Sequence, residues 1–173
     1  MATLDPTSVK RRSPLNQRHV TSHALFKEFG GNLLVGHYGD IKSIQEEYSQ
    51  AQMLAICDLS TLPRLGFKGP GAPSWLETQK LKLPTLPNTA KCQHTGSLVA
   101  KLSDQEVLIL SDIFALSNDV ATLSHKAEID HQNYYKQTYI LPRGDSHCWL
   151  AVTGTQASEM FSKICGIDLR SHK

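Results

Sequence analysis

The sequence predicts an α+β protein organised around a β-α-β-β-α-β unit. Between residues 64 and 141, short apolar runs of strand length alternate with segments of helical period, and the polar turn Ser103–Gln105 separates two of the strands as in a hairpin. This order is that of a ferredoxin-like sandwich, in which two helices cover one face of an antiparallel sheet. With 173 residues, 40% hydrophobic and 20% charged, the chain is long enough for one domain or two small joined units.

The N-terminal part divides into an arm and a lead-in. Residues 1–21 are rich in Thr, Ser, Pro and Arg without an apolar period, so we expect a flexible arm. Residues 22–63 are expected to form a helix-strand-helix lead-in, with a helix over Ser22–Phe29 closed by Gly30–Gly31, then a strand over Asn32–His37. Asp40 is expected to cap the next helix, whose apolar positions are Ile41, Ile44, Tyr48, Ala51 and Ala55.

Residues 64–141 are expected to form the ferredoxin-like unit. Its predicted elements are the strand Arg64–Lys68, a helix presenting Ala72, Trp75 and Leu76, the strands Ser97–Leu102 and Glu106–Leu110, a helix over Asn118–Lys126 and the strand Lys136–Leu141. The residues expected in its core are Phe67, Trp75, Leu76, Leu108, Leu110, Val120, Leu123 and Ile140.

Residues 142–173 resemble the start of a second copy of this unit. Leu65 to Gly69, followed by a helix, has the same layout as Leu150 to Gly154 followed by Ala157, Met160 and Phe161, at a constant offset of 85 (Gly154 minus Gly69). A strand over Ile167–Arg170 is expected to follow this helix. The second copy then has no room for its own hairpin and second helix, so an uncovered strand edge is expected, to be covered by the first unit or by another chain.

Charge and composition exclude several classes of function. The 18 basic and 16 acidic residues leave a net charge of +2, well short of the basicity of nucleic-acid-binding proteins. No apolar run approaches the roughly 20 residues of a membrane span, and no signal peptide is recognisable, so we expect a cytoplasmic protein without membrane association. The four cysteines, Cys57, Cys92, Cys148 and Cys165, have no metal-ligand spacing and are expected to be packed or partly buried thiols.

No catalytic or metal-binding constellation stands out. His19 and His23 are four residues apart, but they lie in or beside the arm without a companion carboxylate, and we interpret them as a solvated pair. Acid–base chemistry near Tyr38, Asp40 and Asp58 has no pair fixed by local geometry. We therefore assign no catalytic residues and no metal ligands.

Several short motifs resemble those of a known family. Phe29-Gly-Gly, Tyr38-Gly-Asp, Cys57-Asp-Leu-Ser, Gly66-Phe-Lys-Gly-Pro and Trp75-Leu occur in the same order as the F-G-G-W, Y-G-D, D-V-S-H-M and R-G-P-D-A motifs of the folate-dependent aminomethyltransferases, the T-protein family of glycine cleavage. The segments Leu102–Leu110, His147–Gly154 and Ile164–Leu169 are similar to the gamma subunit of heterotetrameric sarcosine oxidase, a smaller relative. The resemblance implies a T-protein or folate-binding type of fold.

The departures from the family concern its chemistry. In the transferases an Asn-Asp pair follows the helix after G-P-D-A, and its aspartate holds the reactive nitrogen of tetrahydrofolate, whereas Lys82 and Leu83 stand at these positions. Thr61 and Leu62 replace the histidine and methionine of D-V-S-H-M. The resemblance implies that Tyr38, Asp58, Ser60 and Leu62 border a folate cavity; alternatively, Asp58 and Ser60 are turn and capping residues.

Two functions follow from the resemblance. In the first, the chain is a non-catalytic, gamma-type subunit of a heteromeric sarcosine oxidase, which oxidatively demethylates sarcosine or a related N-methyl amine, with flavins on partner subunits. In the second, it is a stand-alone tetrahydrofolate-binding or aminomethyltransferase-like protein of one-carbon metabolism. The missing aspartate favours the first, because handling the folate nitrogen requires a carboxylate. We expect no firmly bound cofactor, with tetrahydrofolate as the candidate ligand, and association with sarcosine oxidase-type subunits or with a second copy.

Overall fold

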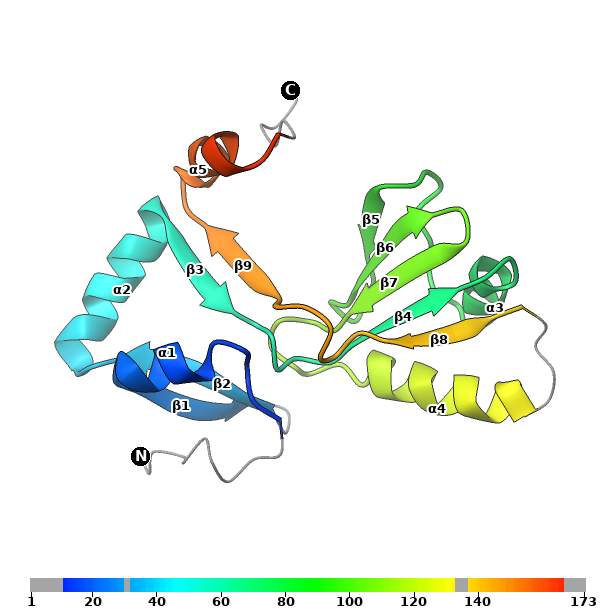
Figure 1. Ribbon diagram of the computed structural model, residues 1–173, viewed down its shortest axis with the longest axis horizontal. Helices are drawn as coiled ribbons and strands as arrows, with labels where there is room; N and C mark the ends of the chain where they lie inside the picture. The colour runs from blue at the N-terminus through cyan, green and yellow to red at the C-terminus, as the bar shows by residue number, and fades with distance from the viewer. Residues whose placement is uncertain (1–10, 30–31, 133–136, 167–173) are drawn as a thin grey trace. The chain divides into compact units, whose positions relative to one another are not determined.

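The computed structural model describes residues 11–29, 32–132 and 137–166, and these form two compact units (Figure 1). Unit 1 comprises residues 11–28, 33–61 and 148–166, and unit 2 lies within residues 62–147, with Phe29 and Asn32 added. Unit 1 is therefore built from two stretches far apart in the sequence, with most of unit 2 lying between them.

Unit 2 has the expected order of elements. They are β4 (Arg64–Lys68), α3 (Ala72–Thr78), β5 (Thr89–Cys92), β6 (Leu98–Ser103), β7 (Glu106–Leu110), α4 (Asp119–Gln132) and β8 (Tyr139–Pro142). The sheet has the order β5-β6-β7-β4-β8, and all its neighbouring strands are antiparallel. Apart from the edge strand β5, which was not predicted, this is the β-α-β-β-α-β sandwich that the sequence predicts.

Both helices of unit 2 pack on the same face of the sheet. Leu65 and Phe67 are two residues apart on β4 and so share a face, and they pair in register with Ile109 and Val107 of β7. These four side chains join one buried cluster with three residues of α3 (Ala72, Trp75, Leu76) and three of α4 (Val120, Leu123, Ala127). The indole nitrogen of Trp75 donates a 2.8 Å hydrogen bond to Asp130, so the buried aromatic ring also ties α3 to α4.

The face of β7 was predicted wrongly. Val107 and Ile109 are fully buried, whereas Leu108 and Leu110, which we expected in the core, lie on the opposite face and are half-buried. The run Val107–Leu110 is apolar at every position, so it contains no alternation from which a face can be chosen. Pairing with β4 decides the register, and the register decides the face.

The buried side chain of Arg64 binds the segment that follows β8. Arg64 is 7% exposed, and its guanidinium donates to the carbonyl oxygens of Arg143 and Gly144, both at 2.7 Å, and of His147. A planar guanidinium with donors in a fixed fork suits three converging carbonyl groups. Residues 143–147 are thereby held against the start of β4.

Unit 1 contains the remaining elements. They are α1 (Asn16–Thr21), the hairpin of β1 (Ala24–Phe29) and β2 (Asn32–Tyr38), α2 (Ile41–Met53), β3 (Ala55–Asp58), β9 (Leu150–Thr153) and α5 (Ala157–Ile164). As expected, Asp40 caps α2, because its carboxylate accepts the backbone N–H of Ser43 at 3.1 Å. β3 pairs antiparallel with β9 in a separate two-stranded sheet.

Four expectations for unit 1 and the cysteines were wrong. Ser22–Phe29 is not a helix, because Ala24 and Phe26 are buried with the period of a strand and β1 pairs with β2. The arm is not wholly irregular, since Asn16–Thr21 is helical and buries His19. Ala55 begins a strand rather than extending the helix. Cys57, Cys92 and Cys148 are exposed, and only Cys165 is half-buried. The strand expected over Ile167–Arg170 lies outside the described residues.

The internal repeat is real in three dimensions. Both copies run strand, glycine with positive φ, helix: β4, Gly69 (φ 121°) and α3 in unit 2, and β9, Gly154 (φ 108°) and α5 in unit 1. A Cβ at Gly69 would collide with the carbonyl oxygen of Gln137, and one at Gly154 with that of Met53. The residue two positions after each of these carbonyl groups starts the paired antiparallel strand, β8 or β3. In the repeat, β3 of unit 1 therefore occupies the position that β8 occupies in unit 2.

We predict that shortening the two neighbouring side chains of β7 has unequal effects. Ile109→Ala should lower the free energy of unfolding by about 2–4 kcal/mol, because it empties space in a close-packed core. Leu108→Ala, the matched control on the other face, should cost roughly half as much or less. Urea unfolding of the two variants measures both, and an equal or reversed order would contradict the register of β7.

Candidate functional site

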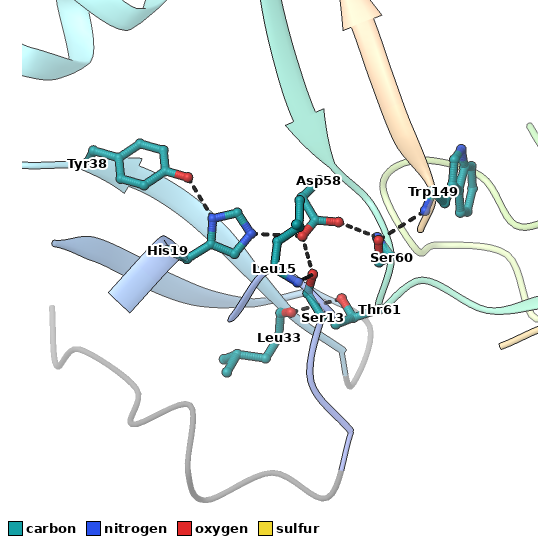
Figure 2. Close-up of polar contacts among 9 residues, drawn as sticks. All are labelled: Ser13, Leu15, His19, Leu33, Tyr38, Asp58, Ser60, Thr61 and Trp149. Atoms are coloured by element: carbon teal, nitrogen blue, oxygen red, sulfur yellow. Dashed lines mark hydrogen bonds and ion pairs between the residues drawn. The ribbon is translucent and has the colours of Figure 1, made fainter. Parts of the chain in front are cut away.

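The candidate site is centred on Asp58, the last residue of β3 (Figure 2). Its side chain is only 4% exposed. One carboxylate oxygen, Oδ1, accepts the backbone N–H of Ser60 at 2.9 Å, which closes a tight turn after the strand. The other, Oδ2, accepts from the ring of His19 at 2.8 Å and from the hydroxyl of Ser13. Three donors from separate positions in the sequence therefore converge on one carboxylate.

His19 extends this contact to Tyr38. The ring is carried by α1, and the residue is 8% exposed. Because an ionised carboxylate only accepts hydrogen bonds, the nitrogen Nε2 that faces Asp58 carries the hydrogen. On the far side of the ring, Nδ1 lies 2.7 Å from the hydroxyl of Tyr38, the last residue of β2. In a neutral ring this nitrogen accepts the phenolic hydrogen, so donation runs from Tyr38 through His19 to Asp58 (Figure 2).

The surroundings of Asp58 and Tyr38 shift their pKa values in opposite directions. Burial raises the pKa of Asp58, but hydrogen bonds from His19, Ser13 and Ser60 outweigh it, and the net pKa lies below the ordinary value of the group. The pKa of Tyr38 is raised, first by burial and then by the nearby carboxylates of Glu47 and Asp58. At neutral pH the carboxylate is therefore ionised and the phenol protonated, which is the arrangement that the chain of hydrogen bonds requires.

The turn after β3 is held by further hydrogen bonds. The Ser60 hydroxyl accepts the backbone N–H of Trp149 at 3.0 Å, and the carbonyl of Ser60 accepts from the Arg11 guanidinium at 3.0 Å. The Thr61 hydroxyl donates to the carbonyl of Leu33 in β2 at 2.8 Å. Residues 58–61 thus connect the segment before α1, the β1–β2 hairpin and the start of β9 (Figure 2).

An open cavity of about 960 Å³ lies beside this network within unit 1. Its wall includes His19, Tyr38 and Asp58, together with His37, Glu46 and Glu47. Glu47 accepts the backbone N–H of Tyr38 at 2.6 Å, while Nδ1 of His37 is buried without a hydrogen-bond partner. The cavity is large enough for a small organic molecule and offers both donors and acceptors.

The arrangement is better suited to holding structure or a ligand than to covalent chemistry. Asp58 uses three of its roughly four acceptor positions on groups of the protein itself. Within the described part of the chain, no three histidine, cysteine, aspartate or glutamate side chains are placed to hold a metal ion. None of the described helices is long and apolar enough to cross a membrane.

The residues that the sequence singled out fall in different surroundings. Tyr38 and Asp58 belong to one network, and Ser60, 3% exposed, holds the adjoining turn. Leu62 has no exposed surface and lies in unit 2. His19, which we had interpreted as a solvated histidine, is the buried link between Tyr38 and Asp58. Its partners are 19 and 39 residues away in the sequence, so no local spacing could have identified it.

Lys82 and Leu83, the positions that the motif resemblance matches to the family's Asn-Asp pair, have structural contacts in unit 2. Leu83 packs against the hydrophobic core of this unit. Gln93, 9% exposed, holds the preceding residue by its backbone: its side-chain oxygen accepts from the N–H of Lys82 at 2.9 Å, and its nitrogen donates to the Lys82 carbonyl at 3.0 Å. A carboxylate at position 83 would therefore replace a half-buried apolar contact.

Comparisons with known proteins identify the fold. No family model matches the sequence, and no curated protein matches it significantly. Among solved structures, the chain is similar to glycine cleavage system aminomethyltransferase T from Bartonella henselae, with a TM-score of 0.58 and 16% identity. It is also similar to heterotetrameric sarcosine oxidase from Corynebacterium sp. U-96, with a TM-score of 0.59 and 16% identity.

The match covers different shares of the two similar proteins. The match covers 87% of this chain but only 42% of the aminomethyltransferase chain. For the sarcosine oxidase chain, the match covers 92% of this chain and 69% of the other. The chain therefore has the fold shared by T-proteins and sarcosine oxidase, and it spans less than half the length of the transferase.

We predict that Asp58 supports the fold in a pH-dependent way. Asp58→Asn should lower the free energy of unfolding at pH 7 by about 1–3 kcal/mol, because it weakens charge-assisted hydrogen bonds at a buried position. Since the pKa of Asp58 is lowered in the folded protein, its contribution is present above its unfolded pKa and disappears as the pH falls through the folded value. The cost of the substitution should therefore shrink between about pH 5 and pH 3.

Urea unfolding across this pH range measures the effect. The matched control is Asp104→Asn, since the Asp104 carboxylate is 81% exposed and pairs with Lys101 at the surface. The control should change stability by less than about 1 kcal/mol at every pH. A cost for Asp58→Asn that equals the control, or that grows toward low pH, would show that the network does not support the fold.

Proposed function

We propose that this chain is a non-catalytic subunit of a heteromeric amine oxidase of the sarcosine oxidase type. The flavin chemistry, oxidative demethylation of sarcosine or a related N-methyl amine, takes place on partner subunits, and this chain supports their assembly. The proposal is carried by two facts taken together: the share of a sarcosine oxidase chain that this chain covers, and the leucine at the position that the motif resemblance matches to the transferases' aspartate. The chain corresponds to 69% of a sarcosine oxidase chain, while Leu83 stands where the related transferases have their folate-binding aspartate.

The Asp58 carboxylate already accepts hydrogen bonds from other groups of the protein, and this supports a structural role. Its carboxylate, which the family resemblance places beside a folate cavity, already accepts from His19, Ser13 and Ser60. Withdrawing it to serve a substrate would leave donors of the protein unpaired, at a cost of about 1–3 kcal/mol each. A residue with so many internal partners acts more readily as an anchor than as a reacting group.

We predict that the chain forms a stoichiometric complex with flavin-bearing subunits. The tagged chain is co-expressed with the polypeptides encoded beside it and purified by size exclusion. The expected result is a single peak with flavin absorbance that forms hydrogen peroxide when sarcosine or a related N-methyl amine is added. Flavoprotein that is complete and equally active without this chain would contradict the proposal.

A second function, binding of tetrahydrofolate, is favoured by the cavity of about 960 Å³ beside Tyr38 and Asp58. The residues present suit a polar ligand, but the carboxylate that the transferases use at the reactive nitrogen is missing at position 83. If the chain binds folate, calorimetric titration with tetrahydrofolate should give a saturable signal that weakens several-fold in Tyr38→Phe. Asp104→Asn, a surface change in unit 2, serves as the control.

We predict that the isolated chain does not transfer an aminomethyl group from a glycine-derived donor to tetrahydrofolate. The expected result is no methylene-tetrahydrofolate above the rate without protein, because no carboxylate stands at the family's position. Turnover that is present in the wild type and abolished by Asp58→Asn in folded protein would contradict this prediction, because it would mean that another carboxylate performs the chemistry.

A further inference from the structure

The cavity of about 960 Å³ carries an excess of negative charge on its wall. Every residue that lines it within the described part of the chain belongs to unit 1. These lining residues include three acidic side chains, those of Glu46, Glu47 and Asp58, and one arginine, Arg18. The volume lies in the range of pockets that hold small organic molecules. The charge of the wall therefore favours a ligand of positive charge over an anion.

Tyr38, the last residue of β2, borders the cavity with a hydroxyl whose hydrogen is already in use. The ionised Asp58 accepts from Nε2 of His19 at 2.8 Å, so Nδ1 of the neutral ring keeps a lone pair and accepts the phenolic hydrogen at 2.7 Å (Figure 2). The phenolic oxygen then has only lone pairs left to offer. Toward a ligand in the cavity, Tyr38 is therefore a hydrogen-bond acceptor and not a donor.

Glu47 of α2 places a second acceptor near this oxygen. Its Oε1 accepts the backbone N–H of Tyr38 at 2.6 Å, which holds the carboxylate against the end of β2. After burial, the charge of Glu47 is the largest cause of the raised pKa of Tyr38, so the carboxylate acts on the phenol at short range. None of the ion pairs between described residues involves Glu47. The cavity thus has two neighbouring acceptors that no described cation neutralises.

A protonated amine is the chemical group that matches these two acceptors. It carries a positive charge and up to three N–H donors, so one hydrogen can go to Glu47 and another to Tyr38. A carboxylate or phosphate would place its own lone pairs against those of both groups. An alcohol can donate to one of them but brings no charge.

The cavity also offers apolar surface to the remainder of such a molecule. The apolar side chains of its wall are those of Leu15, Val35, Ala51, Ala55 and Ile56. Ile56 is 64% exposed although it lies within the strand β3. A hydrocarbon group attached to the amine would remove part of this surface from water, which is favourable. The wall therefore suits an amine with an apolar body better than ammonium itself.

We propose that this cavity binds a small organic amine in its protonated form, which donates N–H groups to the Tyr38 hydroxyl oxygen and to the Glu47 carboxylate and lays its apolar body against Ile56. The inference goes beyond the proposed subunit function and does not rest on it, since neither a flavin nor a partner chain takes part. It is also independent of the folate alternative, whose ligand carries negatively charged carboxylates.

NMR titration of the ¹⁵N-labelled full chain at pH 7 tests the proposal with three probes that share a benzyl group. Benzylammonium has both charge and N–H donors, benzyltrimethylammonium has charge without donors, and benzyl alcohol has a donor without charge. Benzylammonium should give saturable shifts of the backbone amides of Tyr38, Glu47 and Ile56. The other two should bind roughly tenfold more weakly, because neither forms charge-assisted hydrogen bonds to both acceptors.

Two conservative substitutions assign the contacts. Glu47→Gln keeps an oxygen for the backbone N–H of Tyr38 but removes the charge, so it should raise the dissociation constant of benzylammonium roughly tenfold and leave that of benzyl alcohol near the wild-type value. Tyr38→Phe keeps the aromatic ring but removes the acceptor. It should weaken benzylammonium several-fold and leave benzyltrimethylammonium nearly unchanged, so that the smaller size of benzylammonium cannot explain the difference.

The matched control is Glu159→Gln, a glutamate of α5 in unit 1 that is 69% exposed and does not line the cavity. This variant should bind all three probes like the wild type. Circular dichroism verifies that the three variants are folded.

Three results would overturn the proposal. The first is the absence of saturable shifts with benzylammonium up to about 50 mM, which would mean that the cavity is filled by the chain itself or binds no amine. The second is equal affinity for benzylammonium and benzyltrimethylammonium, which would mean that no N–H is recognised. The third is binding that neither Glu47→Gln nor Tyr38→Phe weakens, which would place the amine elsewhere.

Discussion

Asp58 carries a charge on a side chain that is 4% exposed, and a carboxylate at that depth is stable only while donors surround it. Its donors come from Ser13, before α1, from His19 within α1 and from Ser60 in the turn after β3. Tyr38 joins β2 to the same group through the ring of His19. The N-terminal segment, the β1–β2 hairpin and the β3 turn therefore share one electrostatic anchor. This requirement explains why residues 16–21 form an ordered helix although their sequence has no apolar period.

The two strands that pair in the β3–β9 sheet of unit 1 are separated in the sequence by most of unit 2. The pairing of β3 with β9 joins residues 55–58 to residues 150–153, so it closes a loop that contains most of unit 2. Unit 2 builds its core from residues between Leu65 and Ala127, and Arg64 binds the carbonyl groups of residues 143–147 that follow its last strand. Folding of unit 2 first would bring the two stretches of unit 1 near each other and reduce the entropy lost when β3 and β9 pair.

The polar groups of the site are largely satisfied by one another. The half-buried Tyr38 and the Asp58 side chain, both with shifted pKa values, are connected through hydrogen bonds to His19, and at neutral pH the phenol is protonated and the carboxylate ionised. Leu83 packs on the hydrophobic core of unit 2. Among the described residues, the feature of this site that can receive another molecule is the cavity of about 960 Å³ beside Tyr38.

The sequence by itself determined the elements whose signals are local. Apolar runs bounded by turns gave the bounds of β4 and β7, Asp40 marked the start of α2, and the repeated strand, glycine and helix identified β9 and α5. Only the tertiary structure decided which face of the uniformly apolar β7 is buried and that residues 24–29 form a strand. It also showed that residues 55–58 form the strand β3, which pairs with β9. It also brought His19 to Asp58 and Tyr38. For β7, β3 and His19 the deciding partner lies far away in the sequence, and pairing energy between distant strands or buried polar groups leaves no periodic trace in the segment itself. For residues 24–29 the deciding partner is the neighbouring strand β2, and pairing with it overrides the helical reading of the segment.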